Sequence, residues 1–423
     1  MRGRRPPAED AMRRRLGVPD AVVIGLGSMI GAGIFAALGP AATAAGSGLP
    51  LALALAALVA YCNATSSARL AARYPRSGGT YVYGRERLGD FWGYLAGWAF
   101  VVGKTASCAA MALTVGAYAW PEHAHAVAVA AVLALTAVSY VGVRKSALVT
   151  RVLVAAVLAV LGTVVVTALT SGEADATRLG GGSGPTVGGV LQAAGLLFFA
   201  FAGYARVATL GEEVRDPERT IPRAIPIALG GTLLVYVLVA TAASTVLGPE
   251  RLADATAPLA DAARATGADW LVPVVRGGAV AASLGSLLAL LLGVSRTALA
   301  MARDRHLPRA LAAVHPRFDV PHRAELLVGA VVAVLAATGD LRGAIGFSSF
   351  GVLVYYAVAN VSAWTLTRDE GRPNRAIPVV GVVGCGVLAL ALPLNAVVSG
   401  AAVLALGAAV HALRGVRTGR SRR

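Results

Sequence analysis

The sequence predicts an all-α integral membrane protein with about 12 transmembrane helices, on the evidence of its composition, its apolar runs and its arginines. Of the 423 residues, 57% are hydrophobic and only 14% are charged. A soluble globular protein carries about 25% charged residues. The apolar runs are each near the roughly 20 residues that a helix needs to cross a bilayer. They leave no room for a sizeable soluble domain.

Twelve apolar runs, separated by polar loops, are the candidate spans. The last two are divided only by a turn at Pro393 and Asn395. We expect one transmembrane domain over residues 19–415, between tails at 1–18 and 416–423. The runs begin near Ala21, Leu49, Phe91, Ala124, Ala147, Val187, Ile221, Leu271, Ala324, Ile345, Ile377 and Asn395.

The arginines predict the topology. Both tails and every even-numbered loop are basic, while the other loops are short or lean acidic, as at Glu173 and Asp175. Because positively charged loops stay on the cytoplasmic side, an even number of spans places both termini in the cytoplasm. Lysine is almost absent beside abundant alanine, glycine and arginine, which indicates a GC-rich bacterial genome. We therefore expect a multi-pass protein of the bacterial inner (plasma) membrane.

Several classes of function are disfavoured by the same residues. A net charge of +16 would suggest nucleic acid, but the arginines lie in loops that flank the membrane, so we expect no nucleic-acid partner. The three cysteines are far apart and show no metal-ligand spacing. No nucleophile or catalytic dyad recurs in the spans, so we predict no enzyme, no cofactor and no metal site. We interpret the six histidines as interfacial, because they fall near span ends or in loops: His123, His125, His306, His315, His322 and His411.

Glycines interrupt two of the spans. The first span carries four glycines in nine residues, at Gly25, Gly27, Gly31 and Gly33, and the sixth is interrupted at 198–204. Paired interruptions in two halves of a chain are a pointer to the binding site of a carrier. Where a helix is broken, its free N–H groups can bind an anion and its free carbonyls a cation. Close helix packing through small residues is the alternative interpretation.

Four motifs together resemble the amino acid–polyamine–organocation (APC) superfamily of permeases, and most closely its cationic-amino-acid-transporter-like branch. These motifs are the first-span signature at 30–35, the stretch at 75–81, the element at 211–223 and the element at 296–318. The resemblance covers roughly residues 18–395. It implies a LeuT-type fold of two inverted five-helix repeats, at about 19–171 and 186–368, with two extra helices at about 376–414. It also implies secondary active transport of amino acids across the plasma membrane by alternating access.

The resemblance implies a substrate site at the two interrupted spans, one and six. The α-carboxylate of an amino acid would meet backbone N–H groups of the first span, and its α-amino group would meet carbonyls of both spans. Phe201 and Tyr204 would cover the site. The substrate-binding candidates are Met29, Ile30, Gly31, Ala32, Gly33, Phe201, Ala202, Gly203 and Tyr204.

The sequence departs from the family at two positions that bear on charge. Ala205 stands where family members often have an aspartate, and Val157 stands where many have a fifth-span lysine. The coupling ion, Na⁺ or H⁺, therefore stays open. Two cationic residues, Lys104 and Arg206, lie inside spans three and six. An ionisable side chain at membrane depth is a functional candidate, so we predict a preference for neutral or acidic amino acids.

Other polar residues are candidates for coupling or gating, each with a structural alternative. Ser283 and Ser286 can coordinate sodium beside span one or bond to their own helix. Glu212 and Glu213 can act in a gate or be solvated carboxylates, and Tyr355 can gate the outer cavity or simply pack. An exchanger or uniporter of cationic amino acids or polyamines is the alternative function, and a channel is a more remote one. Beyond substrate and lipid bilayer, the sequence does not indicate an oligomeric state.

Overall fold

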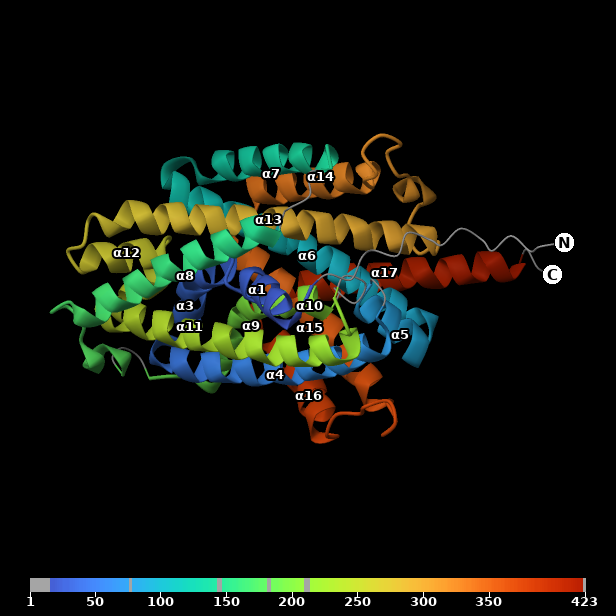
Figure 1. Ribbon diagram of the computed structural model, residues 1–423, viewed down its shortest axis with the longest axis horizontal. Coiled ribbons are helices and arrows are strands. Elements are labelled where there is room, and N and C mark those ends of the chain that lie inside the picture. Colours follow the sequence, from blue (N-terminus) through green and yellow to red (C-terminus); the bar gives the residue numbers. More distant parts are fainter. Residues whose placement is uncertain (1–15, 76–77, 143–146, 181–183, 209–213, 421–423) are drawn as a thin grey trace.

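The computed structural model describes residues 16–75, 78–142, 147–180, 184–208 and 214–420. These residues form an elongated bundle of helices, and the only strand-like pairing among them is an isolated bridge between Leu16 and Val214 (Figure 1). The helices are α1 (Val18–Met29), α2 (Ala32–Ala36), α3 (Leu38–Ala45), α4 (Leu49–Arg73), α5 (Thr80–Leu88), α6 (Asp90–Ala119), α7 (Ala124–Tyr140), α8 (Ala147–Thr170), α9 (Val187–Phe201), α10 (Ala205–Ala208), α11 (Pro217–Asp254), α12 (Pro258–Ala265), α13 (Leu271–Arg303), α14 (His322–Thr338), α15 (Leu341–Trp364), α16 (Ala376–Ala391) and α17 (Leu394–Arg420).

Ten described segments are long and apolar enough to cross a membrane. They match ten of the twelve predicted spans. The other two predicted spans are the helices α14 and α16, which have 17 and 16 residues. A helix that spans a bilayer needs about 17 to 25 residues, so α14 lies at the short end of this range and α16 lies just below it. The all-α membrane architecture predicted from the sequence is confirmed.

The bundle has a buried centre and a lipid-facing rim. The centre is formed by α6, α15 and the α9–α10 segment, whose most apolar stretches are mostly buried within the protein. The helices α7 and α14 lie along one edge next to α13, and α16 protrudes from the opposite side (Figure 1). Large apolar side chains are exposed on this rim, for example Leu133, Leu390 and Leu406. Such exposure is expected where lipid replaces water.

The short helix α5 connects two spans and packs back on the next one. It begins after Gly79, whose φ is +57°, and it ends at Gly89, whose φ is +102°. Both conformations favour glycine because a Cβ atom is strained there. A Cβ atom on Gly84 would lie 3.0 Å from the Cα atom of Gly93, so α5 lies directly against the first turn of α6. This contact sets the position of the polar residues at that end of the bundle.

Candidate functional site

The first span is broken at Ile30 and Gly31, which are not part of any helix. The helix α1 ends at Met29, and α2 begins at Ala32 after Gly31 with φ −64° and ψ −130°. That ψ turns the chain out of the helical path and leaves the first N–H groups of α2 without partners in their own helix. The glycine pattern therefore marks a real interruption, while the binding role of these residues stays a prediction.

The sixth span is interrupted more tightly. The helix α9 ends at Phe201, a single 3₁₀ turn covers Ala202–Tyr204, and α10 continues from Ala205. A 3₁₀ turn replaces i→i+4 bonds by i→i+3 bonds and often marks a strained or functional point of a helix. The carbonyl oxygen of Ala202 lies within this turn and accepts hydrogen bonds from side chains of other helices.

The two interruptions are in direct backbone contact. A Cβ atom added at Gly203 would lie 2.2 Å from the carbonyl oxygen of Ser28 and 2.7 Å from the amide nitrogen of Met29. One at Gly33 would lie 2.6 Å from the Cα atom of Ala200. Close packing through small residues, the alternative left open by the sequence, is therefore present at the same residues that break the helix.

A tyrosine of α11 bridges both interrupted spans. The hydroxyl of Tyr236 lies 2.5 Å from the carbonyl oxygen of Met29 and 3.0 Å from that of Ala200. It has one proton to donate, so the two carbonyls share it. The ring of Tyr236 packs edge-on against Phe201 at 5.1 Å. This residue could not be identified from the sequence, because a lone tyrosine in an apolar span resembles an ordinary core residue.

The predicted substrate-binding residues are enclosed. The side chains of Met29, Ile30 and Ala32 are at most 2% exposed, and Phe201 and Tyr204 are fully buried. The ring of Tyr204 stacks on Tyr356 of α15 at 5.0 Å. The break is thus covered on one side by an aromatic pair, of which the sequence predicted only Tyr204.

Lys104 of α6 reaches the interruption of the sixth span. Its Nζ atom lies 3.4 Å from the carbonyl oxygen of Ala202, and the hydroxyl of Tyr356 lies 3.3 Å from the same oxygen. Lys104 is only 7% exposed. Arg206, on the following turn in α10, is half-buried and also has partners among other groups. The two cationic candidates therefore flank the 3₁₀ turn from different helices.

Ser286 of α13 faces the break of the first span, and Ser283 lies one helical turn earlier in α13. A Cβ atom on Gly31 would lie 1.9 Å from the Oγ atom of Ser286. Both hydroxyls are buried, and neither has a hydrogen-bond partner within the described residues. Bonding to their own helix, the alternative considered from the sequence, is therefore not what the geometry shows. Val157 of α8 is buried among apolar side chains of the core.

Of the three gate candidates, only Tyr355 belongs to the part of the chain that the structure describes. Glu212 and Glu213 are outside the described residues. The hydroxyl oxygen of Tyr355 accepts a hydrogen bond of 3.0 Å from the backbone amide of Thr80, and its ring lies 5.2 Å from that of Phe100. Thr80 begins α5, in the basic loop after the second span. Tyr355 therefore packs against the start of α5, and a role as a gate stays a prediction.

Glu370 is the centre of an ion-pair network at this basic end. Its carboxylate accepts from Arg87 at 2.6 Å and lies 3.4 Å from Arg73. Hydrogen bonding by the Arg87 guanidinium, followed by the amide of Thr367, lowers the pKa of Glu370 to about 2. The loop after α15 is thereby tied to α4 and α5.

A second polar cluster at the basic end joins residues far apart in the chain. Asp90, His306 and His411 place one ligand atom each within 4.8 Å of one another. The sequence interpretation treated these histidines as separate interfacial residues and predicted no metal site. No short-range spacing connects positions 90, 306 and 411, so only the fold could reveal the cluster.

Two interrupted spans are in contact inside the buried centre of the bundle. Aromatic rings enclose them, and a buried lysine approaches them. This arrangement is typical of a membrane transporter of small solutes. Comparison with known proteins agrees. The family model described as amino acid permease matches residues 16–410. The chain belongs to this family, and hence to the APC superfamily suggested by the motifs; it is a transporter, not an enzyme.

Three relatives illustrate the similarity, and each is named as a transporter or a permease. An uncharacterized transporter of Mycobacterium tuberculosis is 74% identical over 413 residues, covering 98% of this chain and 94% of that protein. The branched-chain amino acid permease BcaP of Bacillus subtilis is 27% identical over 88% of this chain and 85% of its own length. Cationic amino acid transporter 7 of Arabidopsis thaliana is 32% identical over 83% of this chain and 65% of its own length. The mycobacterial similarity supports the bacterial origin inferred from composition.

Proposed function

We propose that this protein transports amino acids across the bacterial inner membrane by alternating access, with the substrate held where spans one and six are interrupted. The contact between Gly203 and the Ser28–Met29 backbone supports this proposal most directly. It brings two sets of backbone groups, both released from regular helix bonding, to one enclosed place. Backbone released from a helix is tolerated in a membrane only where protein or a cavity satisfies it.

The backbone groups divide into donors and acceptors for the two ends of an amino acid. The N–H groups of Gly31, Ala32 and Gly33 begin α2 and suit a carboxylate. The carbonyls of Ile30 and Phe201 suit an ammonium group. The carbonyls of Met29 and Ala202 accept from Tyr236, Lys104 and Tyr356 in this state. We therefore expect Ile30 and Phe201 to be the main acceptors, and Met29 and Ala202 to join when those side chains move.

We propose that the preferred substrates are neutral or acidic amino acids. The buried cation of Lys104 next to Ala202 supports this preference, because a second cation there would be repelled. The alternative is an exchanger or uniporter of cationic amino acids or polyamines. The name of the Arabidopsis relative favours that alternative, and the name of the Bacillus relative favours apolar substrates.

Two arrangements for coupling follow from the buried polar groups. The hydroxyls of Ser283 and Ser286 are buried and have no hydrogen-bond partner within the described residues, and that of Ser286 lies next to Gly31, where carbonyls of the first span could complete a sodium site. Lys104 is the second candidate, because its amine can release and rebind a proton during the transport cycle. We expect uptake to depend on either sodium or pH. An exchanger would instead need substrate on the opposite side.

The test is uptake into proteoliposomes, with twenty amino acids and putrescine as competitors and with sodium and pH varied. A carrier saturates and shows counterflow, whereas a channel conducts steadily. We expect serine, leucine or glutamate to compete better than arginine or putrescine. Lys104→Met should lower uptake of the preferred substrate at least tenfold, while Lys145→Met, at the only other lysine in the chain, should not change it. Stronger competition by arginine in the wild type would refute the preference but not the transport of amino acids.

A further inference from the structure

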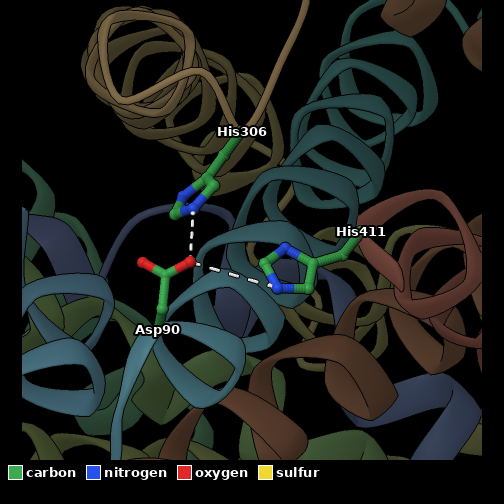
Figure 2. Close-up of side chains that lie close together, drawn as sticks. All are labelled: Asp90, His306 and His411. Atoms are coloured by element: carbon green, nitrogen blue, oxygen red, sulfur yellow. Dashed lines mark hydrogen bonds and ion pairs between the residues drawn. The ribbon is translucent and has the colours of Figure 1, made fainter. Parts of the chain in front are cut away.

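Asp90, His306 and His411 come from three separate elements and converge at the basic end of the bundle. Asp90 is the first residue of α6, His306 follows α13, and His411 lies near the end of α17. The Nε2 atoms of both histidines point toward the same carboxylate oxygen of Asp90 (Figure 2). The distances to that oxygen are 3.1 Å from His306 and 4.0 Å from His411.

The backbone after α13 fixes His306 in this position. Arg305 adopts a left-handed conformation with φ +65°. The amide of His306 then bonds to the carbonyl of Met301 at 2.7 Å, and that of Arg305 bonds to Ala302 at 3.1 Å. This pair of bonds is a Schellman motif, which ends a helix and reverses the chain. The histidine is therefore directed back onto α6 by main-chain geometry and is only 9% exposed.

Hydrogen bonding assigns the proton of the His306 ring. The hydroxyl of Tyr81 lies 2.6 Å from the Asp304 carboxylate and 2.9 Å from Nδ1 of His306. The phenol of Tyr81 carries a proton, because a tyrosine hydroxyl ionises only at about pH 10. That single proton goes to Asp304, because an ionised carboxylate only accepts. Nδ1 of His306 must therefore donate to Tyr81, which leaves Nε2 of the neutral ring with a lone pair.

A lone pair on Nε2 would face the carboxylate of Asp90 at 3.1 Å unless a cation lies between them. A proton on Nε2 would serve His306 and Asp90 alone. It would give no role to His411, whose Nε2 is directed at the same oxygen and whose ring is held by stacking on Tyr94 at 4.6 Å. A metal ion accommodates all three groups, because two imidazole nitrogens and a carboxylate oxygen form a common ligand set.

We propose that Asp90, His306 and His411 bind a divalent transition-metal ion, with Zn²⁺ the best match to the ligand set. Ligand distances of about 2.0–2.2 Å are reached by moving the two rings by about 1 Å. The fourth position is open to water, since the side chain of Asp90 is 58% exposed. The chain from His306 through Tyr81 to Asp304 is the outer-shell support that metal-bound histidines commonly have.

Neighbouring cations set the strength and the pH dependence of the site. Arg85 lies 3.4 Å from the other oxygen of Asp90 and also pairs with Asp304. Arg414 donates to the carbonyl of His306 at 2.8 Å. Both charges oppose a divalent ion, so we expect micromolar rather than tighter affinity. Protons compete for the two imidazoles, so the affinity should fall as pH decreases through the histidine range.

Metal binding would tie the ends of α6, α13 and α17 together. The contact between α6 and α17 already includes hydrogen bonds from Tyr94 to Gly407 and from Trp98 to Val403. The contact between α17 and the turn after α13 includes the histidine cluster and the hydrogen bonds of Arg414. An ion bound here should therefore raise the thermal stability of the protein, since it binds the folded state only.

The experiment is a Zn²⁺ titration of the purified full-length chain, after chelator treatment and removal of any affinity tag. Calorimetry gives the stoichiometry, and Co²⁺ absorption reports the ligand geometry. We expect one ion per chain, an at least tenfold loss of affinity in Asp90→Asn, His306→Gln and His411→Gln, and weaker binding at pH 6 than at pH 7.5. The matched control is His315→Gln with His322→Gln, which removes another close histidine pair with rings 5.4 Å apart.

The outcomes separate a metal site from its alternatives. The proposal is supported if the Zn²⁺ affinity is unchanged in the control variant, His315→Gln with His322→Gln, and is lost in His411→Gln. The side chains of Asp90 and His411 are partly exposed, so we expect their variants to fold. These variants keep the test valid if His306→Gln does not fold. Absence of Zn²⁺ binding, with a pH-dependent melting temperature that His306→Gln abolishes, would mean that a proton alone bridges the pair and would overturn the proposal. Equal Zn²⁺ binding in all variants would overturn it as well. Neither result depends on amino acid transport.

Discussion

Replacing Gly203 with alanine tests whether the contact between the interrupted spans underlies transport. The added Cβ atom would lie 2.2 Å from the Ser28 carbonyl oxygen, whereas real Cβ atoms essentially never approach closer than 3.0 Å. The two backbones must therefore separate by about 0.8 Å, at a place where neither can move as a flexible side chain would. Overpacking of this kind costs about 1–3 kcal/mol.

The cost falls on the arrangement that we propose to bind substrate. If this free energy destabilises the transport-competent state, kcat/KM for uptake should fall by about 5- to 150-fold. The assay is the initial rate of uptake in proteoliposomes, normalised to inserted protein, with size-exclusion behaviour as the check of folding. The matched control is Gly162→Ala in α8, where no atom lies within 4 Å of the added Cβ. In that control a helix gains about 1 kcal/mol of propensity, so uptake should be unchanged.

One result would refute the reasoning. If Gly203→Ala is monodisperse and transports at the wild-type rate, then the two spans do not have to touch at Ser28 during the cycle. A loss of uptake shared equally by Gly162→Ala would point to a general effect of glycine replacement. A loss confined to Gly203→Ala is the expected outcome.

Three further predictions concern groups around the site and the basic end. Tyr236→Phe leaves two buried carbonyls without their shared donor, which should destabilise the protein by about 1–3 kcal/mol in thermal unfolding, while Tyr94→Phe should leave uptake intact. Gly31→Ala should abolish uptake through the clash with Ser286, and Ser286→Gly should restore part of it in the double variant; no restoration would place the conflict elsewhere. Because the folded-state pKa of Glu370 is lowered from 4.5 to about 2, its ion pairs stabilise the protein above pH 4.5 and are lost as pH falls toward 2. The melting-temperature difference between wild type and Glu370→Gln should shrink over that range.

Much of the fold could be predicted because its signals are local. A bilayer span is recognised from about 20 consecutive apolar residues, and ten of the predicted spans meet that criterion in the structure. The break at Gly31 is also local, since glycines weaken a helix by about 1 kcal/mol each relative to alanine. The short helices α14 and α16 show the limit of the approach. Hydropathy identified both, but it could not determine how little of each remains helical.

The contacts that complete the site could not be predicted, because they join positions that belong to different helices and lie far apart in the sequence. Nothing near Tyr236 in the sequence indicates that its hydroxyl bridges Met29 and Ala200. The partner of Lys104 and the convergence of Asp90 with His306 are of the same kind. A single sequence gives the depth of a residue in a span but not the face of the helix on which it lies. Tyr355 shows the consequence, since its depth alone did not indicate its hydrogen bond with Thr80.

The position of Lys104 helps to decide which relatives are a guide to the substrate of this protein. Its ammonium group lies where α9 ends, next to carbonyls whose partial negative charge favours a cation. A cationic side chain bound about 5 Å from this group would be repelled by about 3 kcal/mol at an effective dielectric constant of 20, which is a factor of more than 100 in affinity. A cationic substrate would thus have to extend away from α6, toward the helices opposite the 3₁₀ turn. Arg206 lies directly after that turn and adds a second positive charge at the same break. We therefore expect these two residues to be a better guide to the charge of the substrate than overall similarity to cationic amino acid transporters.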